Sequence, residues 1–60
     1  MKYNLVLTGI YEYGAAGTAY NEDGNVVARH FSSNLGWLEI DLLRDCNYDD
    51  KKDTYTKDWE

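Results

Sequence analysis

Residues 3–13 alternate between two sets of side chains, as the two faces of a β-strand do. The odd positions of this run are Tyr3, Leu5, Leu7, Gly9, Tyr11 and Tyr13. Its aromatic and β-branched content favours a strand with these positions on one face. The small residues at 14–17 then predict a turn or a flexible tip.

A second turn signal stands between two further apolar runs. Residues 18–20 begin the second expected strand, and residues 25–31 form the third. Between them lies Asn21-Glu22-Asp23-Gly24, in which Asp-Gly can supply the positive φ values that a hairpin turn needs. The sequence therefore predicts a hairpin over residues 18–31.

Apolar residues then change to a helical spacing. They recur at Leu35, Leu38, Leu42 and Cys46. Ser32-Ser33-Asn34 can cap a first turn through side-chain oxygens, and Asn47 is a suitable stop. Residues 38–42 also alternate strictly, as a strand would, so both interpretations stay open for this segment, although the caps favour a helix.

The C-terminal part is polar over residues 47–53 and alternates again over residues 54–59. A loop and a last edge strand are expected there. The order β-β-β-α-β predicts an α+β fold: a small antiparallel sheet of three to four strands with one helix packed across it. A chain of this length forms a single domain, residues 1–60.

The composition indicates a folded domain whose stability increases when it makes contacts with another chain. Apolar residues make up 43% of the chain, with six tyrosines and two tryptophans. This content is too high for a disordered tail, and Tyr and Trp supply large contact areas at interfaces. Cys46 and His30 are the only cysteine and histidine, which excludes an intrachain disulfide and a four-ligand zinc site. Oligomerisation or partner binding is the expected support for so small a core.

The net charge of −5 is unevenly placed. Residues 39–60 hold eight acidic and four basic side chains. Such a balance argues against direct contact with nucleic acid, which needs basic patches, and favours a basic surface of another protein. The same acidity can also serve only to keep a small protein soluble.

The chain offers no catalytic constellation, and no cofactor or metal is expected. His30 and Cys46 make a poor nucleophile and base pair, because the helical spacing puts Cys46 on the apolar stripe. The calcium-loop pattern that begins at Asn21 fails, because its twelfth position is Ser32. No run approaches the ~20 apolar residues of a membrane span. A binding protein in the cytoplasm, or in a host cytoplasm if it is viral, is the expectation.

The candidate contact surface is the acidic segment around the helix. Asp41 and Asp45 stand one helical turn apart, and Glu39 lies within the apolar arc, a local inconsistency of the kind that marks functional sites. Neighbouring aromatic residues can supply the apolar anchor. The residues expected to bind a partner are Trp37, Glu39, Asp41, Asp45, Tyr48, Asp49 and Asp50.

One resemblance accompanies these residues. The turn Glu22-Asp23-Gly24, the strand after it and the serine-capped segment carrying Trp37-Leu38-Glu39 resemble the small acidic inhibitors that bacteriophages make against host nucleic-acid enzymes. These include anti-CRISPR proteins and inhibitors of uracil-DNA glycosylase. The resemblance implies an inhibitor that presents carboxylates as a DNA mimic, in some members as a homodimer. The alternative is a small self-associating structural or accessory module that uses its Tyr and Trp faces.

Overall fold

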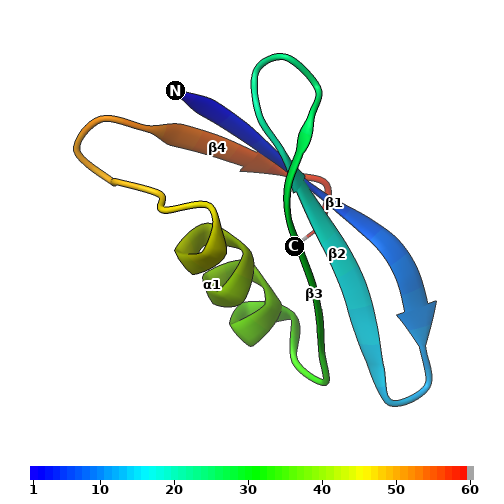
Figure 1. Ribbon diagram of the computed structural model, residues 1–60. Helices are drawn as coiled ribbons and strands as arrows, with labels where there is room; N and C mark the ends of the chain where they lie inside the picture. Colours follow the sequence, from blue (N-terminus) through cyan, green and yellow to red (C-terminus); the bar gives the residue numbers. More distant parts are fainter. Residues whose placement is uncertain (60) are drawn as a thin grey trace.

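A computed structural model describes residues 1–59 of the chain. It contains one four-stranded sheet in the order β3-β2-β1-β4, with a single helix across one face (Figure 1). The elements are β1 (Lys2–Tyr11), β2 (Gly14–Tyr20), β3 (Val26–Ser32), α1 (Leu35–Asp45) and β4 (Thr54–Lys57). This arrangement confirms the α+β fold and the order β-β-β-α-β. No helix among these elements is long and apolar enough to cross a membrane.

The sheet is mixed, whereas a wholly antiparallel sheet was expected. β1 pairs with β2, and β2 with β3, in antiparallel fashion, but β4 runs parallel to β1. The physical reason is the connection through α1, since a helical crossover returns the chain to the end of the sheet from which β3 started. β4 therefore lies parallel to both β1 and β3.

The helix over residues 38–42 is confirmed, and both of its ends are fixed by asparagine. Asn34 Oδ1 accepts hydrogen bonds from the backbone amides of Gly36 (2.8 Å) and Trp37 (3.2 Å). At the other end Asn47 follows the helix with a φ of 60°, a left-handed value that asparagine tolerates. The caps therefore outweigh the strand-like alternation of this segment.

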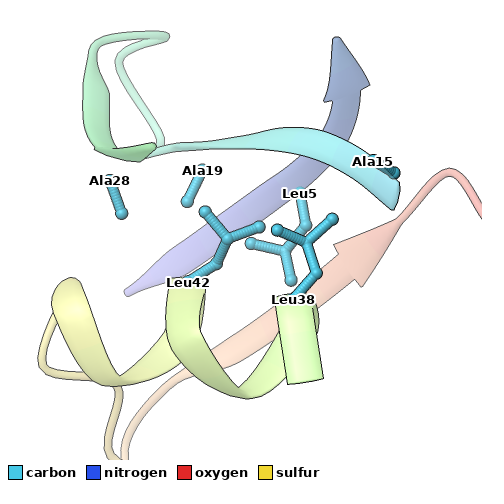
Figure 2. Close-up of a cluster of buried hydrophobic side chains, with 6 residues drawn as sticks. All are labelled: Leu5, Ala15, Ala19, Ala28, Leu38 and Leu42. Atoms are coloured by element: carbon cyan, nitrogen blue, oxygen red, sulfur yellow. The ribbon is translucent and has the colours of Figure 1, made fainter. Parts of the chain in front are cut away.

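The core lies between α1 and the inner face of the sheet (Figure 2). It consists of Leu5, Ala15, Ala19, Ala28, Leu38 and Leu42. Gly17 lies directly under the helix: a Cβ atom there would be 3.1 Å from side-chain carbons of Leu38 and of Leu42. The expected turn at 14–17 is wrong for this reason. These residues are small because they form the start of β2, where the helix approaches closely, and the turn falls at residues 12–13.

A β-bulge divides β1 into two parts. The register with β2 shifts between Leu7 and Gly9. Tyr3 and Leu5 are buried, and Leu7 packs against the core. Beyond the bulge Tyr11 lies on the other side of the sheet, in contact with the ring of Phe31. The expectation that the odd positions of 3–13 share one face is therefore correct only before the bulge.

Replacing Gly17 with valine is expected to lower the free energy of unfolding by about 1–3 kcal/mol, because the added carbons overpack the contact with α1. Urea denaturation followed by circular dichroism measures this effect. Ala16→Val, at the next position of β2 on the opposite face, is the control and is expected to change stability by less than about 1 kcal/mol. Equal losses in the two variants would contradict close packing of α1 at Gly17.

Candidate functional site

Glu39 faces β4 and is engaged within the chain. Its side chain is only 18% exposed, and one carboxylate oxygen lies 2.7 Å from the Lys57 ammonium. The other oxygen accepts a hydrogen bond from the Tyr55 hydroxyl. These contacts lower the pKa of Glu39, first through Lys57 and then through Tyr55. They also raise the pKa of Tyr55 to about 12, mainly because its hydrogen bond to Glu39 favours the protonated form. The structure thus gives Glu39 an internal contact in place of the open position expected for it.

Asp41 and Asp45 lie on the side of α1 away from Glu39. Asp45 is 58% exposed, and one of its oxygens lies 3.0 Å from His30 Nε2 on β3. The contact is an ion pair only when the imidazole is protonated. The same nitrogen is buried and has no hydrogen-bond partner among residues 1–59. Asp41 is partly exposed and forms no ion pair within residues 1–59.

The loop after α1 holds the next three candidates. Tyr48 is partly buried, with its ring edge-on to the rings of Tyr3 and Tyr55 at centroid distances of 6.3 and 5.2 Å. Asp49 shapes the loop, because its carboxylate accepts a hydrogen bond from the Lys51 amide at 2.9 Å. Asp50 is exposed. Of these three, only Asp50 has the open position that a partner contact needs.

Asp53 completes this loop, a role that sequence reasoning missed. Its carboxylate lies 3.0 Å from the N-terminal ammonium and accepts the Asp49 amide at 2.9 Å. The pKa of Asp53 is lowered, first by this amide and then by the ammonium. The residue therefore joins the loop to the start of β1, and its negative charge is locally compensated.

Trp37 and Ile40 are apolar but exposed, by 60% and 44% respectively. Both lie on the side of α1 that points away from the buried Leu38 and Leu42, as the helical period requires. We call this surface the outward helix face; it consists of Trp37, Ile40, Asp41 and Arg44. It unites two residues of the expected surface, Trp37 and Asp41, but leaves Glu39 and Tyr48 outside.

A second apolar surface lies at the turn between β1 and β2. Tyr11, Tyr13 and Phe31 form an aromatic cluster, with ring centroids 5.9–6.1 Å apart. The sequence predicted Tyr11 and Tyr13 on the first strand and Phe31 on the third, and it did not bring the three rings together. Two glycines leave room for these rings: a Cβ at Gly9 would be 2.7 Å from the Tyr11 hydroxyl, and one at Gly14 would be 2.8 Å from Phe31 Cζ.

Cys46 is the one thiol of the chain, and it is partly buried. Among residues 1–59 no three His, Cys, Asp or Glu side chains come together as metal ligands. Burial raises the pKa of the Cys46 thiol, and its Sγ lies 3.4 Å from the Leu43 carbonyl, to which it donates. A raised pKa keeps the sulfur protonated and unreactive at neutral pH.

Comparison of the chain with protein-family models, with curated proteins and with solved structures found no match. The function is therefore inferred from the surfaces described above.

Proposed function

We propose that this chain is a protein-binding domain that docks the outward helix face on a basic surface of another protein. The observation that carries the proposal is Trp37, which is 60% exposed on a helix whose opposite side is fully buried. Leu38 and Leu42 fix the helix to the sheet, so the indole is held on a rigid element. A rigid, exposed tryptophan is typical of the residues that dominate binding energy at interfaces.

The surroundings of Trp37 indicate the chemistry of the partner. Ile40 widens the apolar surface, and Asp41 stands one helical turn from Trp37 on the same face. An apolar centre beside Asp41 fits a partner that offers an apolar pocket with a Lys or Arg next to it, and Arg44 on the same face can pair with an acidic or polar group of that partner. The net charge of −5 would attract such a basic partner at long range.

The acidic surface is smaller than the sequence suggested. Glu39 and Asp53 are engaged within the chain, whereas Asp41, Asp45 and Asp50 retain at least partial exposure. Asp41 lies one turn from Trp37, Asp45 ends the helix beside His30, and Asp50 lies in the following loop. One carboxylate beside an aromatic anchor, with two more further along, supports a compact contact better than a long imitation of a DNA strand.

Within this proposal the partner is a nucleic-acid-binding enzyme, and the chain acts as its inhibitor. Such enzymes carry the basic grooves that bind phosphates, and these grooves suit an acidic helix with a protruding indole. The action is non-enzymatic and takes place in the cytoplasm. It requires no cofactor and no direct contact with nucleic acid.

The test begins with capture from a bacterial lysate on the immobilised chain, at low and at high salt. A basic nucleic-acid enzyme that is retained at low salt and released at high salt is then purified and titrated with the chain. The expected result is binding that weakens with salt and blocks the enzyme from its nucleic acid. If the captured protein binds with the same affinity at both salt concentrations, the charge-based proposal fails.

In the same titration, Trp37→Ala is expected to weaken binding about 30-fold, since truncating an aromatic anchor typically costs about 2 kcal/mol or more. Val26→Ala is the matched control, because Val26 is also about half exposed but lies on β3. Asp41→Asn is expected to weaken binding at low salt only, whereas Glu12→Gln at the β1–β2 turn should leave it unchanged. Unchanged binding of Trp37→Ala would exclude the outward helix face.

A further inference from the structure

The sheet face opposite α1 is open, and it carries the aromatic cluster. The register places Val6, Thr18 and Arg29 in one row across β1, β2 and β3. Gly9, Ala16 and Phe31 form the next row toward the β1–β2 turn. Their neighbours Leu5, Ala19 and Ala28 point to the core under the helix. The two rows therefore belong to the face that α1 does not cover, although Thr18 within the first row is itself buried among its neighbours.

The cluster is fixed in position by the backbone around it. The Tyr11 ring lies against Gly9, and the Phe31 ring against Gly14, so closely that either glycine leaves no room for a Cβ atom. Yet Tyr11, Tyr13 and Phe31 remain 52%, 73% and 49% exposed. The rings thus form a rigid apolar surface that water covers in the isolated chain, which is typical of an interaction site.

We infer that this face binds a second copy of the same chain, so that two sheets meet through their aromatic clusters in an isologous dimer. Complete burial of an aromatic side chain removes about 150–250 Å², so the three exposed fractions leave roughly 350 Å² of ring surface per copy. A weak but specific dimer buries roughly 600 Å² per copy. The remaining area has to come from the residues that flank the cluster on the same face. These residues are Val6, Tyr20 and Arg29.

Charge opposes a second copy less on this face than on the helix side. Among the described strand residues, Lys2 and Arg29 are the charged ones that point outward here, and Glu12 lies in the turn beside the rings. The acidic residues of α1 and of its following loop lie on the opposite side of the sheet. Two chains of charge −5 therefore meet with most of their acidic groups kept apart.

Arg29 makes the patch complementary to itself. It is exposed, it forms no ion pair within residues 1–59, and it shares a face with Phe31, two residues along β3. A guanidinium binds favourably over a Tyr or Phe ring. In a two-fold contact, Arg29 of each copy meets the rings of the other copy, so the same pair forms twice.

Sedimentation equilibrium of the purified chain, from low micromolar to near-millimolar concentration, tests the inference. The chain is expected to pass from monomer to dimer in this range, and added salt should not dissociate the dimer. Tyr13→Ser, at the most exposed ring, is expected to weaken dimerisation at least tenfold. Arg29→Ala removes two cation–ring contacts and is expected to weaken it about tenfold.

Two further results separate this dimer from other modes of contact. Circular dichroism of Tyr13→Ser should match the original chain, which shows that lost assembly is not lost folding. Trp37→Ala should dimerise normally, because Trp37 lies across the sheet from the cluster. A chain that stays monomeric at the highest concentration, or a dimer lost in Trp37→Ala but kept in Tyr13→Ser, would overturn the inference. Neither outcome bears on the binding of a basic partner by the outward helix face.

Discussion

Leu38→Ala is expected to leave the chain largely unfolded or close to it. Leu38 is 0% exposed and packs against the sheet at Gly17, beside Leu5 and Leu42. Truncation of such a leucine costs about 2–5 kcal/mol, because it removes buried apolar surface and leaves a cavity. A domain of sixty residues has a total stability of only about 3–9 kcal/mol. Thermal and urea denaturation, followed by far-ultraviolet circular dichroism, measure the loss.

Ile40→Ala is the matched control for this experiment. Ile40 belongs to the same helix, two residues further on, and is 44% exposed. The same truncation should therefore cost less than about 1 kcal/mol. Similar losses in both variants would mean that α1 does not pack through the Leu38 side, and the outward helix face would then be assigned to the wrong side.

The elements that sequence reasoning identified correctly are those fixed by local interactions. The cap at Asn34 and the stop at Asn47 act within one helical turn. The hairpin turn depends on Gly24, whose φ of +82° is readily adopted only by a few residue types. In each case the residues that form the signal also make the contact, so no distant part of the chain is needed.

The errors in the fold arise where distant segments meet. Small residues at 14–17 suit either a flexible turn or a strand under a closely packed helix, and only the position of Leu38 and Leu42 decides between them. The parallel pairing of β4 was open to prediction, since a strand–helix–strand connection generally gives parallel strands. The bulge between Leu7 and Gly9 has no comparable local signal, and it conceals the aromatic cluster.

The residues of the candidate site also divide into those whose role local spacing predicts and those whose role depends on distant segments. The inconsistency of Glu39 on the apolar side of the helix was visible in the sequence and is real. Its meaning depends on Tyr55 and Lys57, which are 16 and 18 residues away. A charged residue on the inner side of a helix can mark a functional site or an internal ion pair, and the sequence does not distinguish these. Trp37 could be identified, because helical spacing alone turns it away from the side of Leu38 and Leu42.

Glu39→Ala is expected to loosen β4 from the rest of the fold. The substitution leaves Lys57 and the Tyr55 hydroxyl without their partner. A hydrogen bond to a charged group contributes about 1.5–3 kcal/mol, but the contact with Lys57 contributes less than this, because its side chain is 35% exposed and screened by water. We therefore expect a loss of about 2–3 kcal/mol, measured by urea denaturation. Hydrogen exchange should show faster exchange of the backbone amides of β4. Asp41→Ala, on the opposite side of the same helix, is the control and should cost less than about 1 kcal/mol.

The dependence of this loss on pH identifies its electrostatic origin. The pKa of Glu39 is lowered in the folded chain, from a usual value of 4.5, so its contribution is present above pH 4.5 and disappears as the pH falls through the folded value. The difference in unfolding free energy between the original chain and Glu39→Ala should therefore shrink below pH 4.5. At the alkaline end, loss of Glu39 should lower the pKa of Tyr55 from about 12 toward 10, visible as earlier phenolate absorbance. A difference that stays constant from pH 7 into acid would show that Glu39 acts through packing and not through its charge.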